Sequence, residues 1–96
     1  MRRWASDMLD FCGVTLFVIT QKLSSGKGWE TFISADGSNS ARLATFESLP
    51  NLTEASRFHA KVVSEFKLAD LDLDQTSRAQ VRELVKSILT QVITLA

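Results

Sequence analysis

The single histidine and the single cysteine are the residues of this 96-residue chain with the widest chemical range. A general base needs a partner within hydrogen-bond reach, and a zinc site needs several histidine or cysteine ligands. One copy of the chain holds too few of either for a His/Cys zinc cluster. We therefore expect His59 at the edge of an apolar helix face, and Cys12 as a small buried side chain in a reducing compartment.

An acidic triplet, Asp70, Asp72 and Asp74, has the spacing that opens an EF-hand calcium loop. Such a loop also needs glycine at its sixth position and a bidentate acid at its twelfth. This sequence has Gln75 and Val81 there. The triplet is therefore expected to be a solvated acidic stretch that leads into a helix, with no metal bound.

A glycine-framed lysine, Gly26-Lys27-Gly28, superficially resembles a phosphate-binding loop. A P-loop is longer and leads into a helix, whereas this segment leads into the strand-like run that starts at Trp29. We expect a hairpin connection. No remaining group of residues could run an enzyme's reaction, so the sequence predicts a non-enzymatic binding protein without a cofactor.

The elements that position these residues follow from the spacing of apolar side chains. Trp4, Met8 and Phe11 are separated by four and three residues, which predicts a short amphipathic helix over residues 2–12. Residues 14–47 contain three runs of β-branched and aromatic residues separated by turn signals. They predict a three-stranded antiparallel β-meander.

Two helices are expected after this sheet. Asn51 stands three residues before Glu54, a capping signal that predicts a helix over residues 52–67. A broad apolar repeat predicts another helix over residues 75–94. The chain, residues 1–96, is thus expected to be one α+β domain with the order α-β-β-β-α-α.

The last predicted helix is apolar over well over half of its circumference, which is more than one sheet can cover. Either the other helices of the chain cover the surplus, or a second copy does. We predict a homodimer through this helix, because closed two-fold pairs are the commonest assemblies. The predicted interface consists of Val81, Val85, Ile88, Val92 and Leu95.

The predicted sheet offers a second candidate surface. Trp29 and Phe32 fall on opposite faces of their strand, so one of them lies on a face that the 2–12 helix either covers or leaves open. An open face could hold a protein partner or stack nucleic-acid bases. The candidate binding surface consists of Trp29, Glu30, Thr31, Phe32 and His59.

Charge and hydropathy limit the class of partner. The chain has 11 basic and 11 acidic residues, whereas proteins that neutralise many phosphates usually carry an excess of basic residues. Nucleic-acid binding, through Lys22, Lys27 and Arg42, is therefore the alternative to a protein partner. Asp7 and Asp10 stand where a signal peptide would be basic, and the longest apolar run is too short to span a membrane. We expect a cytoplasmic protein with no membrane partner.

Three segments of residues 28–65 form one pattern: Gly28-Trp29-Glu30-Thr31-Phe32-Ile33; Arg42-Leu43-Ala44-Thr45-Phe46; and Glu54-Ala55 with His59 and Val62-Val63. This pattern resembles small proteins of bacteria and phages in which an aromatic-Glu-Thr strand precedes an E-A-x-x-x-H-x-x-V-V helix. The extra residues 48–53 depart from it. The resemblance implies a shared topology and a phage or mobile-element origin, and it suggests that Glu30, Thr31 and His59 meet in space. We expect an accessory or inhibitory factor.

Overall fold

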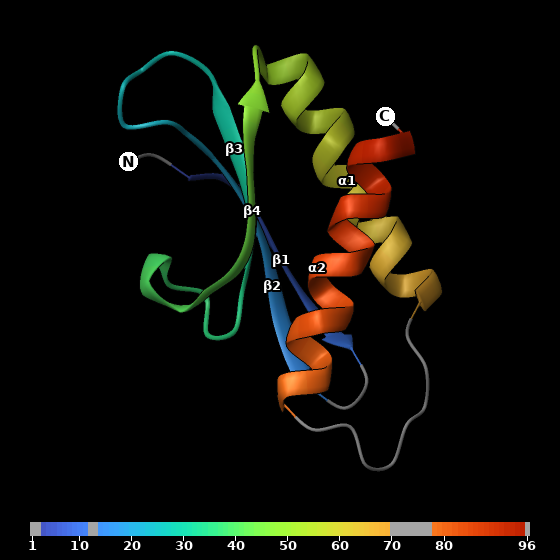
Figure 1. The fold of residues 1–96 in the computed structure, drawn as a ribbon. Helices are drawn as coiled ribbons and strands as arrows, with labels where there is room; N and C mark the ends of the chain where they lie inside the picture. The colour runs from blue at the N-terminus through green and yellow to red at the C-terminus, as the bar shows by residue number, and fades with distance from the viewer. Residues whose placement is uncertain (1–2, 12–13, 70–77, 96) are drawn as a thin grey trace.

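The computed structural model describes residues 3–11, 14–69 and 78–95. Both helices lie on one face of a twisted antiparallel sheet, which confirms the α+β class (Figure 1). The elements in chain order are β1 (Arg3–Phe11), β2 (Val14–Lys22), β3 (Trp29–Ser34), η1 (Asn39–Ala41), β4 (Arg42–Leu49), α1 (Leu52–Ala69) and α2 (Arg78–Leu95).

The predicted helix over residues 2–12 is wrong, and so is the three-stranded sheet. Arg3–Phe11 form β1, an edge strand of a four-stranded sheet with the order β1-β2-β3-β4. The order of elements is therefore β-β-β-β-α-α. Trp4, Met8 and Phe11 have the spacing of a helix face, whereas Leu9 and Phe11 are two residues apart, as on one face of a strand. In so short a segment the sequence pattern fits both elements. Pairing with β2 buries Leu9 and Phe11, and this long-range gain decides the outcome.

Each strand pairs antiparallel with the next one along the chain. Met8 lies opposite Phe17, and Ile19 lies opposite Phe32. The β3–β4 register shifts twice, whereas the β1–β2 register shifts once, near the start of β1. Such irregularities twist a strand and protect a sheet edge from further pairing. From Ala5 to Phe11, β1 is therefore the more regular of the two edges.

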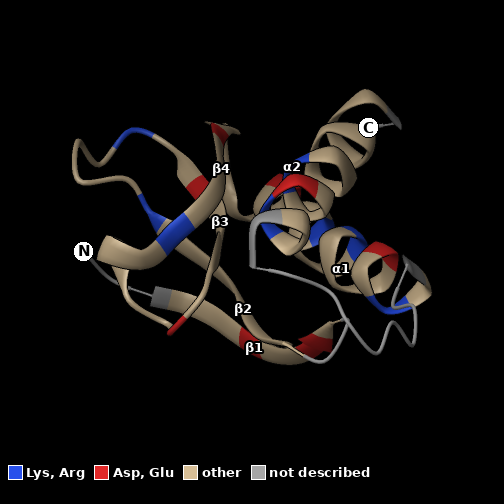
Figure 2. Cartoon of the chain, turned by 60° about the horizontal axis from the view of Figure 1, so that its bottom comes forward, with Lys and Arg blue, Asp and Glu red and all other residues tan. Residues whose placement is uncertain are grey.

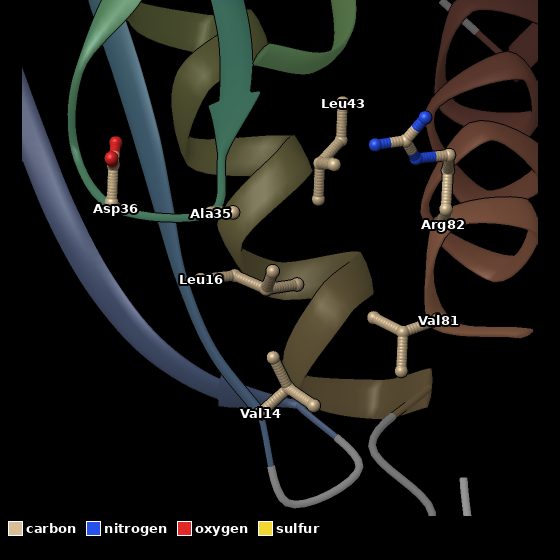
Figure 3. A pocket seen from close by; sticks show the side chains of 7 residues that line it. All are labelled: Val14, Leu16, Ala35, Asp36, Leu43, Val81 and Arg82. Atoms are coloured by element: carbon tan, nitrogen blue, oxygen red, sulfur yellow. The ribbon is translucent and has the colours of Figure 1, made fainter. Parts of the chain in front are cut away.

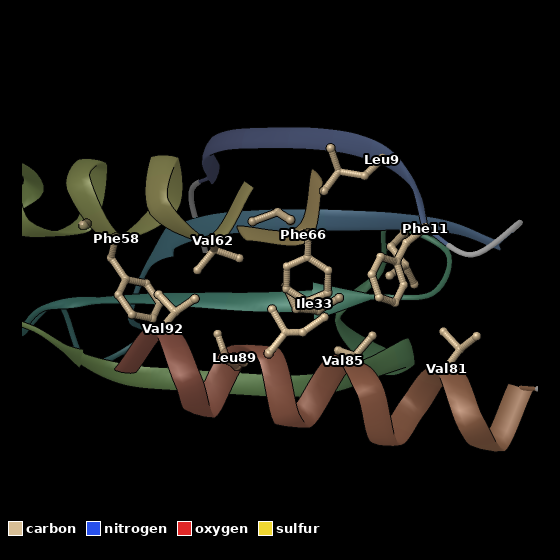
Figure 4. Packing of buried hydrophobic residues seen from close by; sticks show 14 of the residues in the cluster. Leu9, Phe11, Ile33, Phe58, Val62, Phe66, Val81, Val85, Leu89 and Val92 are labelled. Atoms are coloured by element: carbon tan, nitrogen blue, oxygen red, sulfur yellow. The ribbon is translucent and has the colours of Figure 1, made fainter. Parts of the chain in front are cut away.

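The main core lies between the helices and the sheet face that they cover (Figure 4). Alternate residues of the strands point into it, as the two-residue period of a strand requires. They meet the apolar faces of α1 and α2. The buried members of this core include Leu9, Phe11, Leu16, Val18, Ile33, Ala55, Phe58, Val62, Phe66, Val85 and Val92.

Helix α1 begins as the sequence predicts. The Glu54 backbone N–H donates a hydrogen bond to Asn51 Oδ1 at 2.9 Å, which satisfies one of the free amides of the first turn. The helix also has a regular apolar face, since Phe58, Val62 and Phe66 are all buried. Phe66 meets Phe11 of β1 edge-to-face, with ring centroids 5.3 Å apart.

Helix α2 uses its apolar side within the chain. Four of the five residues predicted to form a dimer interface (Val81, Val85, Ile88 and Val92) are buried in the core. The side chain of Leu95 lies outside the described residues. The sheet and α1 together cover the broad apolar arc, and each of these four residues is at most 8% exposed in the single chain. Ile93, which is 36% exposed, is the large apolar residue that α2 leaves at the surface of its described part.

Other predictions fall on residues that the structure does not describe: Cys12 and the acidic triplet Asp70, Asp72 and Asp74. Within the described ranges, no three His, Cys, Asp or Glu side chains gather where they could hold a metal ion. Neither described helix is long and apolar enough to cross a membrane.

Candidate functional site

The residues of the predicted binding surface lie on two faces of the sheet. The alternation of β3 turns Trp29 and Thr31 toward the helices, where Thr31 contacts Thr20 and Trp29 packs against the main core. Glu30 and Phe32 point to the other face. Glu30 therefore does not meet His59, which lies between α1 and the sheet.

A chain of hydrogen bonds links β3, β2, α1 and β1 on the helix side. The hydroxyls of Thr31 and Thr20 are 2.7 Å apart, and Thr20 Oγ1 is 2.7 Å from His59 Nδ1. His59 Nε2 is 2.6 Å from Asp7 Oδ2. The ring of Trp4 packs edge-on against the imidazole, with centroids 6.1 Å apart. The single histidine is thus buried, and both of its nitrogens have a partner.

This order of hydroxyl, imidazole and carboxylate is that of a catalytic triad, but its orientation is reversed. The nucleophile of a triad must reach a substrate. Here Thr20 is fully buried, whereas the Asp7 side chain is 54% exposed. The carboxylate faces solvent and the hydroxyl faces the core. The arrangement satisfies buried polar groups and ties β1 to α1; it does not present a nucleophile.

Replacing Thr20 by valine tests the energetic role of this chain. Valine keeps the shape of threonine, but it leaves His59 Nδ1 and the Thr31 hydroxyl without their shared partner. We expect the free energy of unfolding to fall by about 1–3 kcal/mol, as measured by urea denaturation. Thr45→Val, on the half-exposed part of β4, should change it by less than about 0.5 kcal/mol. Equal effects of the two variants would show that this chain of hydrogen bonds makes no specific contribution to the free energy of unfolding.

A second polar cluster lies on the opposite face of the sheet. Glu30, which is 3% exposed, forms an ion pair with Arg42 and accepts a hydrogen bond from Gln21 Nε2 at 2.9 Å. Asn39 Oδ1 accepts from the same Gln21 nitrogen at 3.1 Å and from the Arg42 guanidinium at 2.8 Å. The guanidinium carbon lies 3.9 Å from the centroid of the Phe32 ring, in a cation–π contact.

This cluster and the β3–β4 connection cover the part of the other sheet face that contains Ile19 and Phe32. Ile19 and Phe32 are fully buried there, although neither described helix packs on them. A β-carbon at Gly37, whose φ is 86°, would lie 3.5 Å from the Phe17 ring, so this turn is folded against the sheet. Phe32 therefore has no free ring face on which a nucleic-acid base could stack.

Asp36 fixes the same turn. Its carboxylate accepts hydrogen bonds from the Ser38 hydroxyl at 2.6 Å and the Ser38 N–H at 2.8 Å. These bonds hold the pKa of Asp36 below its usual value, because they favour the charged form. The turn therefore loses this stabilisation as the pH falls through the lowered pKa.

The three residues predicted to contact nucleic acid are not equivalent. Lys22, the last residue of β2, and Lys27, in the β2–β3 loop, are both exposed. Arg42 is engaged by Glu30 and Asn39. Among these three, the two exposed lysines are the residues available to phosphates. Figure 2 shows basic positions in blue on the loop that leads into β3.

The outer edge of β1 is the surface that the sequence analysis missed. β1 pairs with β2 on one side, and no described strand lies on its other side. Trp4 is 43% exposed and Met8 69% exposed, while Asp7 and Asp10 are exposed nearby. Met8 and Asp10 alternate with Leu9 and Phe11, which is the pattern of a strand with one exposed face. The helical spacing of Trp4, Met8 and Phe11 favoured a helix instead.

No protein-family model, no curated protein and no solved structure matches this chain.

Proposed function

We propose that this domain is a protein-interaction module that binds an extended, basic segment of a partner protein by strand addition at β1. The observation that supports this proposal is the free edge of β1, a nine-residue strand paired only with β2 among the described strands. An edge strand presents a row of backbone N–H and C=O groups on its outer side. An added strand can bind to these groups by main-chain hydrogen bonds.

The exposed side chains of β1 would supply the apolar part of the contact. Trp4 and Met8 are among the few large apolar residues that the described chain leaves at its surface. Tryptophan and methionine are both enriched in protein interfaces. The other two candidate surfaces are closed, because the apolar side of α2 lies in the core and Phe32 lies beneath Arg42.

The charge of β1 favours a basic partner over a second copy of the chain. Asp7, which also contacts His59, and Asp10 are both exposed along this strand. Figure 2 shows acidic positions in red on β1. These carboxylates are three residues apart and point to opposite faces of the strand, so a lysine or arginine on either face of an added strand would lie near one of them. In a two-fold pairing of β1 with itself centred on Asp7, two Asp7 side chains would lie opposite each other, which is unfavourable. A homodimer through β1 is therefore the outcome that the experiment must distinguish from peptide binding.

The direct test uses two synthetic peptides of the same composition. The first alternates lysine and valine and contains one proline at its terminus; the second places this proline at its centre, where it prevents strand pairing. We expect the first peptide to slow hydrogen exchange of β1 amides and the second to leave it unchanged. Equal protection by both peptides, or protection confined to other elements, would contradict strand addition. Exchange that slows with protein concentration alone would instead indicate self-pairing.

Met8→Lys is the variant that tests the same surface by titration calorimetry. It removes an apolar contact and places a positive charge beside the basic peptide, so we expect peptide binding about tenfold weaker. Ile93→Lys is the matched control, because it makes the same change at an exposed apolar position of α2. Equal losses in the two variants would show that the peptide responds only to the charge of the whole domain.

A further inference from the structure

A cavity of about 610 Å³ lies between the first turn of α2 and the strands that face it (Figure 3). Its size is within the range of roughly 300–1,000 Å³ that is common for small-molecule sites. The cavity is separate from the β1 edge, so its role does not depend on the proposed function. Its lining residues are Val14, Leu16, Ala35, Asp36, Leu43, Val81 and Arg82.

The walls of this cavity are aliphatic. Leu16 and Val14 come from β2, Leu43 comes from β4 and Val81 comes from α2, and their side chains point toward one another (Figure 3). No aromatic residue is among the described lining residues. Such walls favour a flexible aliphatic group over a flat aromatic ring, which would find no ring to stack on.

Two charged residues, Asp36 and Arg82, line opposite sides of the cavity. Ser38 donates two hydrogen bonds to Asp36 Oδ1, and the Asp36 carboxylate does not point toward Leu16 or Leu43 (Figure 3). Arg82 is exposed and forms no ion pair with a described residue. Its guanidinium reaches from α2 toward Leu43 (Figure 3). The charged group that extends toward the aliphatic walls is therefore the Arg82 guanidinium.

We propose that this cavity binds an amphipathic monocarboxylate with an aliphatic tail. The tail lies against the Val and Leu side chains, where burial stabilises it by about 0.8 kcal/mol for each methylene group. The carboxylate lies at Arg82, whose planar guanidinium can donate two parallel hydrogen bonds to it. Arg82 can pair with one negative charge, and the ionised Asp36 on the other side of the cavity would repel a second one, which favours a monocarboxylate over a phosphate dianion.

The test is titration of the whole chain with decanoate below its micelle concentration, followed by methyl NMR. We expect saturable binding of one molecule that shifts the methyl signals of Val14, Leu43 and Val81. Decylammonium, which has the same tail and the opposite charge, should bind about tenfold more weakly or not at all. Equal binding of the two probes would show an adventitious apolar contact only and would overturn the proposal.

Arg82→Gln should weaken decanoate binding about five- to tenfold. Lys86→Gln is the matched control, since it removes one positive charge from an exposed position of α2 that does not line the cavity. If the two variants lose affinity equally, the carboxylate does not bind at Arg82. Ala35→Trp, which adds bulk at an exposed lining position, should abolish the methyl shifts while the far-UV circular dichroism stays unchanged. Methyl shifts that survive in this folded variant would place decanoate elsewhere.

Discussion

The double variant Val85→Glu, Val92→Glu is expected to be unfolded at room temperature. Both valines are fully buried in the core between α2, α1 and the sheet. An unpaired carboxylate placed there costs several kcal/mol, and the lost apolar contacts add to that cost. Two such changes are comparable to the whole stability of a small domain, about 5–15 kcal/mol.

Circular dichroism and light scattering of the same samples measure this outcome. The matched control, Ser87→Glu, Gln91→Glu, adds the same two charges at exposed positions of α2 and should stay folded. A Val85→Glu, Val92→Glu variant that is a folded monomer, from a wild type that is a dimer, would contradict the burial within one chain. It would also restore the prediction of a dimer through the last helix.

The parts of the fold that could be predicted have strong local signals. The helix over residues 52–67 has both a cap at Asn51 and a repeating apolar face, and the structure contains it as Leu52–Ala69. The three runs within residues 14–47 are strands β2, β3 and β4. In these segments the period of the apolar residues and the turn residues indicate the same element, so local and long-range preferences agree.

Residues 2–12 were mispredicted because their local signal is ambiguous. Trp4, Met8 and Phe11 fit one helix face, but Trp4 and Met8 remain exposed in the structure. The strand forms because Leu9 and Phe11 reach the core when β1 pairs with β2. This gain depends on contacts with α1, such as that of Phe11 with Phe66, which are distant in the sequence.

The candidate site could be predicted only as a set of residue types. Glu30, Thr31 and His59 were singled out, and all three are buried polar residues. Their partners could not be predicted, because the register of the strands and the position of α1 determine them. Asp7 and His59, for example, are 52 residues apart. The strand alternation that separates Glu30 from Thr31 was available in the sequence, and it argues against one site that contains both.

Arg42→Met is expected to lower the free energy of unfolding by about 2–3 kcal/mol. The change leaves the Glu30 carboxylate buried without its cation, and removal of one partner of a buried ion pair is strongly destabilising. We take a value below the usual range for buried pairs because the Arg42 side chain is 24% exposed and solvent weakens the interaction. Loss of the cation–π contact with Phe32 adds to the effect.

Urea denaturation of Arg42→Met, Glu30→Gln and the double variant separates the ion pair from the packing of each side chain. The double variant should be more stable than the sum of the single losses predicts, since a neutral amide in place of the Glu30 carboxylate needs no cation and can still accept a hydrogen bond from Gln21. Arg57→Met is the control: Arg57 is 75% exposed, and its pair with Glu54 should contribute less than about 0.5 kcal/mol. Additive losses, or a loss no larger than that of Arg57→Met, would show that Arg42 is a solvated cation. Arg42 would then be as available to phosphates as Lys22 and Lys27, and the nucleic-acid alternative would gain its third contact.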